Sequence, residues 1–392
     1  MRYLESTIEG FSEEKFVFLA GPRQVGKTTL AQNWLRPEKN GLYLNWDVIK
    51  DRERFLRPGA QEDVAAYTRV VLDEIHKYAR WKSWVKGLYD KHRAGTRVVV
   101  TGSARLDVYH RSGDSLLGRY ELLRLHPFTV GELMRKTTEG LPRDWLEIEP
   151  VGSAKQTGLA WERLARRSGF PEPFKRDTDL QHRRWSTRRR DLVIREDLRD
   201  TSEIRQISLV EHLALLLPTR VGSPLSLNAL REEISVAHDT VRNWLDALER
   251  LYFCFRLSPY SHKLSRSLRK EQKLYLWDWS QVPEGGPRFE NMVANHLLKA
   301  THYWTDLGYG EFQLWYCRDV DKYEVDFLIT NARKPVVLIE AKDRDTVPSP
   351  ALLRLGKKMK VPMVQLVRHG SVDMRKGSLR VVTAHRYLSA LP

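Results

Sequence analysis

The stretch GPRQVGKT, residues 21–28, constrains the fold of this chain more than any other. It follows the short apolar run KFVFLA (15–20) and precedes TTLAQNWL (28–35), which continues as a predicted helix. Gly21 and Gly26 allow the backbone to wrap closely around a bound anion, and N–H groups at the start of the helix face that anion. A strand, this loop and a helix in this order predict a phosphate-binding loop.

The side chains of this loop specify the ligand further. Lys27 can reach the β- and γ-phosphates of a nucleotide, and the hydroxyl of Thr28 is placed to hold Mg²⁺. We therefore predict ATP and Mg²⁺ as cofactors. The predicted nucleotide-binding residues are Gly21, Pro22, Arg23, Gln24, Val25, Gly26, Lys27, Thr28 and Thr29.

A second motif, VVLDE (70–74), ends an apolar strand with two acids. An aspartate at the carboxyl end of a strand beside the loop can hold Mg²⁺ through water, so Asp73 joins Thr28 as a predicted metal-binding residue. Glu74 can orient or deprotonate the attacking water, and we predict it as a catalytic residue together with Lys27. The combination favours hydrolysis of ATP.

Three further residues are candidates for a role in hydrolysis. Ser103, in TGSAR, is predicted one strand over from Asp73, near the γ-phosphate. Arg119, in SLLGRYELL, can act as an arginine finger on the ATP of a neighbouring subunit, or it can form an ordinary salt bridge. Arg105 is a rival for the finger role. A finger of this kind would make the protein a homo-oligomer.

Short strands recur through the first 130 residues and alternate with helical segments, which predicts an α/β fold with a parallel sheet and helices on both faces. The predicted strands are residues 15–20, 42–47, 69–74, 97–103 and 121–128. Residues 137–158 lose this periodicity and are expected to be irregular, and residues 159–220 are predicted to be helical.

The chain resembles a known family over nearly its whole length. The segments that carry the resemblance are GPRQVGKTTL, VVLDEIHK, TGSARL and LLGRYELLRLHPFTVGEL, with HDTVRNWLDALERLYFCFRL and KLYLWDWS further on. The chain is similar to a prokaryotic family of AAA-type (P-loop) ATPases fused to a C-terminal domain of unknown function. The resemblance implies an ATPase core at 1–135, a linker and helical region at 136–225, a winged-helix-like unit at 226–262 and an α/β domain at 263–392.

The segment SLNALREEISVAHDTVRNWLDALERLYFCFRL (226–257) has the pattern helix, turn, helix, strand. In a DNA-binding winged helix, the second helix would enter the major groove. Its exposed side is predicted to carry two acids among its polar residues, and these would repel phosphate. We therefore favour a structural or protein-contact role. The polar residues are Arg242, Asn243, Asp246, Glu249 and Arg250.

Two strand-like segments, EVDFLI (324–329) and VVLIEAK (336–342), carry the pattern of metal-dependent nucleases. If the strands pair, Asp326 and Glu340 can converge on one Mg²⁺, and Lys342 can position the attacking water. Glu290, on the preceding helix, matches an extra acid of such sites. These residues resemble the PD-(D/E)xK nuclease superfamily, with Val325 where its motif has proline. The resemblance implies a nuclease-like fold, and activity is a separate question.

The net charge of +16 favours polyanionic partners. Residues 351–392 contain nine Lys and Arg against the single acid Asp373, a net of +8. DNA or RNA binding and a solvated basic face are both compatible with this composition.

Two hypotheses follow. In the first, an ATP-driven machine contacts or cleaves nucleic acid through its C-terminal domain. In the second, an ATP-dependent switch binds a protein partner through an inactive nuclease fold. The sequence has no apolar run of about 18 residues, which excludes a membrane span. Two cysteines without metal-ligand spacing, Cys254 and Cys317, fit reduced thiols in a cytoplasmic protein.

Overall fold

The computed structural model of the chain folds into two compact units. The first comprises Met1–His126 and Arg250–Tyr252, and the second comprises Pro127–Glu249 and Phe253–Pro392. The predicted domain boundaries at 136, 226 and 263 stay predictions. None of the described helices is both long and apolar enough to cross a membrane. The residues described are 2–92, 94–102, 116–135, 140–176, 178–201, 204–261 and 271–392.

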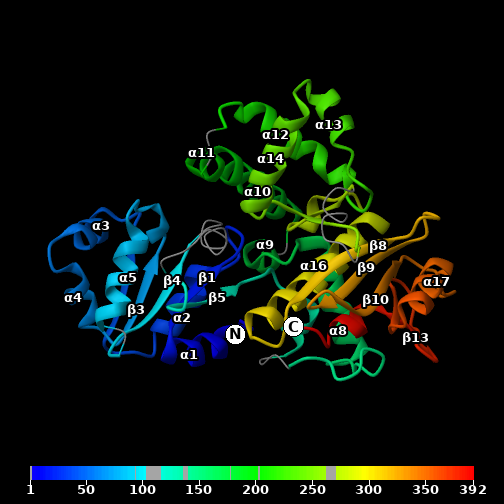
Figure 1. Ribbon diagram of the computed structural model, residues 1–392, viewed down its shortest axis with the longest axis horizontal. Coiled ribbons are helices and arrows are strands. Elements are labelled where there is room, and N and C mark those ends of the chain that lie inside the picture. The colour runs from blue at the N-terminus through cyan, green and yellow to red at the C-terminus, as the bar shows by residue number, and fades with distance from the viewer. Residues whose placement is uncertain are drawn as a thin grey trace. The chain divides into compact units, whose positions relative to one another are not determined.

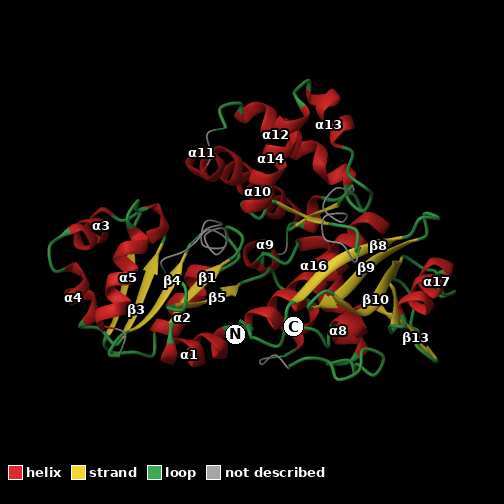
Figure 2. Ribbon diagram, viewed as in Figure 1, coloured by secondary structure: helices red, strands yellow, loops and turns green. Residues whose placement is uncertain are grey.

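The first unit is built on a five-stranded sheet in the order β2-β3-β4-β1-β5 (Figures 1 and 2). Each strand is parallel to its neighbours, as expected for short β-branched runs that are buried on both faces. This confirms the predicted parallel α/β fold, although the strand predicted at 121–128 ends earlier. The strands are β1 (Phe16–Ala20), β2 (Gly41–Asn45), β3 (Arg69–Asp73), β4 (Arg97–Thr101) and β5 (Tyr120–Arg124).

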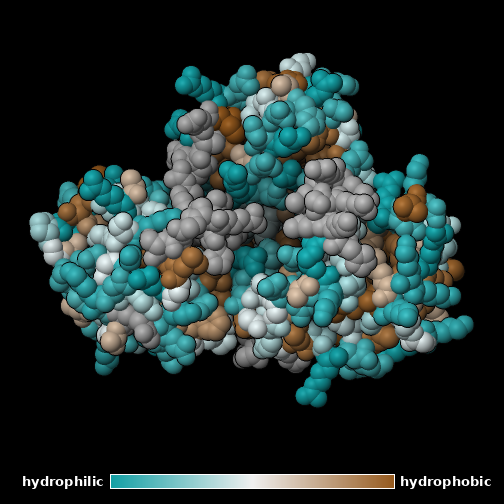
Figure 3. Space-filling model, in the orientation of Figure 1, coloured by the Kyte–Doolittle hydropathy of each residue, from teal (hydrophilic) through white to brown (hydrophobic). Residues whose placement is uncertain are grey.

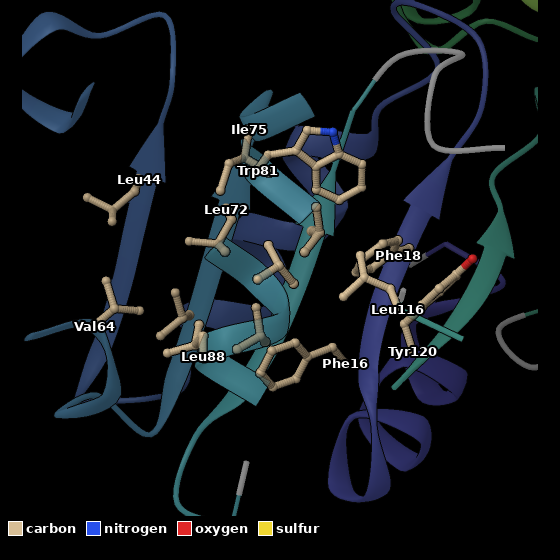
Figure 4. Packing of buried hydrophobic residues seen from close by; sticks show 14 of the residues in the cluster. Phe16, Phe18, Leu44, Val64, Leu72, Ile75, Trp81, Leu88, Leu116 and Tyr120 are labelled. Carbon is tan, nitrogen blue, oxygen red and sulfur yellow. The ribbon is translucent and has the colours of Figure 1, made fainter. Parts of the chain in front are cut away.

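Helices cover both faces of this sheet. One face of β1 presents Phe16 and Phe18 to the buried core that it shares with α5, and the ring of Phe18 stacks on Tyr120 with centroids 4.2 Å apart (Figure 4). Val17 and Leu19 point to the opposite face, where α1 and α2 contact the strands. The helices are α1 (Glu5–Glu14), α2 (Lys27–Leu35), α3 (Ile49–Leu56), α4 (Ala60–Ala65) and α5 (Trp81–His92).

The middle of the chain is helical, as predicted. The helix expected from 159 begins earlier, at Ala154, because the Ser153 side chain accepts a hydrogen bond from the Gln156 N–H while the Gln156 side chain accepts from the Ser153 N–H. The helices of this part are α7 (Val130–Met134), α8 (Ala154–Arg167), α9 (Pro171–Lys175), α10 (Asp179–Asp191), a π-helical turn (Leu192–Asp197), α11 (Leu198–Thr201) and α12 (Ile207–Leu216).

A helix–turn–helix follows, formed by α13 (Leu227–Ile234) and α14 (His238–Arg250). The buried residues of α14 recur at helical spacing, with Trp244 beside the expected Val241, Leu245 and Leu248. The strand β6 (Cys254–Leu257) then pairs antiparallel with β7 (Lys273–Leu276). The predicted order helix, turn, helix, strand is confirmed, and the winged-helix assignment stays a prediction.

The C-terminal part of the second unit is a mixed six-stranded sheet in the order β12-β13-β11-β10-β9-β8. β9 is antiparallel to its neighbours β8 and β10, whereas β10, β11 and β13 run parallel. In Figure 1, the long helix α16 (Gly286–Asp306) lies beside β8, β9 and β10. The remaining elements are β8 (Phe312–Arg318), β9 (Glu324–Asn331), β10 (Lys334–Lys342), α17 (Pro350–Met359), β11 (Met363–Val367), β12 (Asp373–Lys376), β13 (Leu379–Thr383) and α18 (Ala384–Leu388).

The surface of the described residues is predominantly hydrophilic on the face drawn in Figure 3, where hydrophobic residues form small groups between charged ones. This agrees with the charged fraction of 30% in the sequence. Cys254 and Cys317 are both buried and free, as predicted.

Candidate functional site

The glycine-rich loop joins β1 to α2 in the first unit. Gly21 has φ +147°, and a Cβ atom there would lie 2.3 Å from the carbonyl oxygen of Leu125. Gly26, at φ +100°, precedes the first residue of α2. Both residues have a backbone conformation that favours glycine, and at Gly21 the close approach of Leu125 also excludes a side chain.

Lys27 and Thr28 begin α2 and turn toward the loop and the sheet edge. The Nζ atom of Lys27 donates hydrogen bonds to the carbonyl oxygens of Gly21 and Pro22, at 2.8 and 2.9 Å. The Oγ1 atom of Thr28 donates to the Asp73 carboxylate at 3.0 Å. Residues from the two predicted motifs therefore meet, because both follow parallel strands of one sheet and face its carboxyl edge.

Asp73 is buried, and three hydroxyl groups hold its carboxylate. Besides Thr28, the Tyr43 hydroxyl donates to Oδ2 at 2.6 Å, and the Thr101 hydroxyl donates to Oδ1. Burial, followed by the hydrogen bond to Asp73, raises the pKa of Tyr43 above its ordinary range. Tyr43 therefore stays a donor at neutral pH and orients the aspartate.

Glu74 follows β3 in a left-handed conformation, with φ +57°. Its backbone N–H donates to the Thr101 carbonyl oxygen, and its side chain is 25% exposed beside His76, whose Nε2 lies 3.6 Å from a carboxylate oxygen. Burial raises the pKa of the Glu74 carboxyl, and the charges of Lys27 and Lys77 oppose this rise. A carboxylate with a raised pKa accepts a proton from water more readily than an ordinary one.

Of the three further residues predicted to act in hydrolysis, the structure describes only Arg119. Ser103 and Arg105 lie outside the described residues. Arg119 forms an ion pair with Asp90 of α5 at 2.6 Å. It precedes β5 and accepts a backbone hydrogen bond from Phe16 at the start of β1. Arg119 therefore lies at the opposite end of the sheet from the glycine-rich loop of its own chain, and its role as a finger in a neighbouring subunit stays a prediction.

The residues of the first unit fit Mg²⁺ and a nucleotide. The Thr28 hydroxyl and the Asp73 carboxylate present oxygen atoms 3.0 Å apart, and oxygen ligands are those that Mg²⁺ prefers. The Lys27 ammonium contacts the glycine-rich loop. The roles of these residues in nucleotide and metal binding stay predictions.

The second predicted site lies on β9, β10 and α16. The Asp326 N–H donates to the Glu340 carboxylate at 3.3 Å, and the Asp326 carboxylate accepts from the Ala341 N–H at 3.1 Å. Lys342 Nζ lies 2.7 Å from Glu340 Oε1. The antiparallel pairing of the two strands thus brings these residues together as predicted, whereas the PD-(D/E)xK assignment of the fold stays a prediction.

A buried lysine that the sequence interpretation missed lies in this cluster. Lys273 of β7 places its Nζ atom 3.3 Å from Glu290, 2.9 Å from Glu324 and 3.1 Å from Asp326. Its neighbour on the same strand face, Tyr275, donates its hydroxyl to Glu290 at 2.7 Å. The signal was present in KLYL (273–276), because a lysine in an apolar strand calls for a buried acid.

Crowding of negative charge perturbs two of these acids. Burial and the Asp326 charge raise the pKa of Glu290 to about 8, and the same two causes raise the pKa of Glu340 to about 7. The described acids, histidines and cysteines include no group of three arranged to hold a metal ion. The nuclease interpretation of this cluster stays a prediction.

Comparison with known families adds to these observations. Residues 13–134 match a family described as "AAA domain". The chain carries an AAA-type P-loop ATPase domain. Two families described as domains of unknown function follow it, DUF8612 over residues 159–282 and DUF4143 over residues 285–386.

The similar curated proteins are named as uncharacterized. One from Haemophilus influenzae is 22% identical over 84% of this chain and 83% of its own length. One from Mycobacterium tuberculosis is 26% identical over 67% of this chain, and the match spans 54% of that protein. One from Methanocaldococcus jannaschii is 24% identical over 70% of this chain and 62% of its own length.

Solved structures give weaker likenesses. A Walker-type ATPase of Pyrococcus abyssi matches with a TM-score of 0.42 and 15% identity, over 70% of this chain and 92% of that chain. Thermotoga maritima RuvB matches with a TM-score of 0.31 and 16% identity, over 68% of this chain and 94% of that chain. Scores of this size support no argument about function.

Proposed function

We propose that this chain is a Mg²⁺-dependent ATPase whose first unit binds and hydrolyses ATP. The observation that carries the proposal is the contact of Thr28 with Asp73 beside the loop that contains Gly21 and Gly26. This arrangement suits a nucleoside triphosphate with its metal ion, because it combines a hydroxyl, a carboxylate and a loop of backbone N–H groups.

Four side chains have separate roles in the proposed hydrolysis of ATP. Lys27 binds the terminal phosphates, where its positive charge stabilises the charge that develops during phosphoryl transfer. Thr28 and Asp73 hold Mg²⁺, which when bound shields the phosphate oxygens and orients them. Glu74 orients the attacking water and accepts its proton, which its raised pKa favours.

Nucleotide binding tests this assignment. Lys27→Ala should weaken binding of a fluorescent ATP analogue by at least about 10-fold, since it removes a charge-assisted contact to phosphate. Circular dichroism should show an unchanged fold. The matched control is Lys39→Ala, which removes an exposed lysine of the same unit and should bind like the wild type. Equal affinity for Lys27→Ala and the wild type would refute the site.

For the second unit, we propose a protein-binding role controlled by ATP in place of nucleic-acid cleavage. The basic stretch 351–392 supports this, because four of its nine Lys and Arg residues form ion pairs, three of them with acids outside the stretch. Arg354 pairs with Asp319 and Asp321, Arg368 with Asp343, Arg375 with Glu147 and Glu149, and Arg380 with Asp373.

The helix that would read DNA supports the same conclusion. Asp246 and Glu249 of α14 both contact Arg256 on β6, so two acids occupy this helix face together with their own cationic partner. A phosphate backbone gains little attraction from a surface whose charges are already paired. These contacts favour a structural or protein-contact role for α14.

Salt-dependent binding separates the two candidate functions. Nucleic-acid binding through many phosphate contacts falls steeply, by about 10³ to 10⁵ between 50 and 200 mM salt. We expect the purified chain to show weak or no binding of mixed DNA and RNA at low salt, with or without ATP. Tight binding at low salt that is lost steeply with added salt would instead favour the nucleic-acid hypothesis.

A further inference from the structure

Lys273 is a buried charge of the second unit. Its side chain is 2% exposed, and it belongs to a strand whose other residues are apolar or aromatic. A charged ammonium is costly to bury unless it is paired and hydrogen-bonded. Its position therefore requires that the surrounding acids satisfy it completely.

The surrounding acids meet that requirement. An ammonium group has three N–H donors, and Glu290, Glu324 and Asp326 each place an oxygen within 3.3 Å of Nζ. The acids come from two elements, α16 and β9, whereas the lysine comes from β7. The buried ammonium of Lys273 thus joins β7 to α16 and β9 through ion pairs.

Two further groups of the protein lie close to Glu290. Tyr275 donates to Glu290, and a Cβ atom on Gly222 would lie 3.0 Å from the second oxygen of Glu290. Mg²⁺ requires nearly octahedral oxygen ligands at about 2.0–2.1 Å. An ammonium inside the same set of carboxylates holds their oxygens farther apart and repels an incoming cation.

We propose that Lys273 is a built-in cation that takes the place of a divalent metal ion among Glu290, Glu324 and Asp326, so that the second unit is metal-independent. The cation that pairs with Glu290 of α16 and with the two acids of β9 is then part of the chain itself. This inference is independent of ATP hydrolysis in the first unit, because every residue it uses lies in the second unit.

The test is a Mn²⁺ titration of the nucleotide-free full-length chain, followed by electron paramagnetic resonance. Every protein carries Asp73→Asn, which removes a metal-binding residue of the first unit. In this background, the chain with Lys273 should bind no more Mn²⁺ at about 1 mM than the same chain with Asp326→Asn. Mn²⁺ binding that Asp326→Asn abolishes would overturn the proposal.

Replacement of Lys273 provides a second test of the proposal. Lys273→Met should lower the melting temperature by about 5–10 °C, because it leaves three carboxylates without their cation. Added Mn²⁺ should restore part of this loss, and Asp326→Asn should abolish the restoration. Lys334→Met, at the exposed start of β10, is the matched control and should show neither effect. An unchanged melting temperature for Lys273→Met would contradict the proposal.

If Lys273→Met does not fold, Lys273→Gln, which keeps a polar donor, can be measured in its place. The Mn²⁺ titration of the chain with Lys273 requires no change at this residue and is therefore unaffected. Cleavage of DNA or RNA provides a third readout. Mg²⁺-dependent cleavage by the wild-type chain that disappears in Asp326→Ala, while ATP turnover remains, would also overturn the proposal.

Discussion

Asp73 illustrates how single residues around the nucleotide site depend on one another. Its two carboxylate oxygens accept from Thr28, Tyr43 and Thr101, which come from α2, β2 and β4. Thr28 belongs to the sequence motif of the loop and Thr101 is the first residue of TGSAR, whereas Tyr43 belongs to no motif, and neither Tyr43 nor Thr101 was expected to contact Asp73. Their contribution becomes visible only when the parallel strands lie side by side, because Asn45 and Thr101 flank Asp73 in register.

Tyr43 provides the first prediction. Tyr43→Phe removes a donor that orients the proposed Mg²⁺-binding carboxylate, and loss of such an outer partner costs about 10- to 100-fold in metal affinity. The Mg²⁺ concentration at half-maximal ATP turnover should rise by at least about 10-fold. Tyr67→Phe, which removes a hydroxyl that pairs with Arg54 in the same unit, is the control. An unchanged Mg²⁺ dependence in Tyr43→Phe would exclude this role.

His296 provides a prediction about pH. It is fully buried on α16, where the Val130 N–H donates to Nε2 and Nδ1 bonds the Met292 carbonyl, so the neutral ring has both partners. Burial lowers the pKa of His296 to about 4. In the unfolded chain the pKa of a histidine is about 6.5. The buried neutral ring therefore stabilises the folded state fully above about pH 6.5, and this contribution to the free energy of unfolding is lost as the pH falls toward about 4.

The measurement is the free energy of unfolding of the second unit between pH 7 and 4. The wild type should lose up to about 1.4 kcal/mol more per pH unit than His296→Gln over this window. His369→Gln, which replaces an exposed histidine, should keep the wild-type slope. Parallel profiles of the wild type and His296→Gln would show that the buried ring does not carry the effect.

At the scale of elements, the β9–β10 hairpin combines a predicted pairing with an unexpected turn. Alternation of apolar and charged residues in EVDFLI and VVLIEAK was enough to predict two strands that bring Asp326 and Glu340 together. The turn between them places Ala332 and Arg333 at φ +45° and +62°. Such two-residue turns normally favour Asn or Gly at these positions, so neither Ala332 nor Arg333 signals the turn geometry.

That turn yields a prediction about stability. Ala332→Gly should raise the free energy of unfolding of the second unit by about 0.5–1 kcal/mol, because glycine occupies the left-handed region without a Cβ penalty. Ala351→Gly in α17, where the backbone is helical, should lower it instead. Chemical denaturation of both variants would decide, and a loss of stability in Ala332→Gly would contradict the geometry of the turn.

The elements that sequence patterns could not supply are those set by contacts between distant segments. Lys273 lies 53 residues before Asp326, with which it pairs, and its partners Glu290 and Glu324 lie on different elements. The sequence predicted a metal at Asp326 and Glu340, with Glu290 as an extra acid of the site. The strand that carries Lys273 supplies a cation of its own, and only the packing of β7 against α16 and β9 reveals it.

At the scale of the whole molecule, the net charge of +16 gave little guidance about partners. Four of the nine basic residues of the C-terminal stretch form ion pairs, among them Arg375 with Glu147 and Arg354 with Asp319, whose acids lie far from them in the sequence. Arg380, for example, is fully buried and paired with Asp373. Composition records the number of charges, whereas the attraction of a surface for phosphate depends on which charges remain exposed and unpaired.

The central claim is that the first unit hydrolyses ATP, with Glu74 as the residue that activates water. The most direct test is phosphate release from Mg²⁺-ATP by the wild-type chain beside Glu74→Gln, with nucleotide affinity measured in parallel. We predict steady turnover by the wild type, and turnover reduced by at least about 100-fold in Glu74→Gln with nucleotide binding retained. Equal phosphate release by the two proteins, or none by the wild type while it binds ATP, would contradict the account.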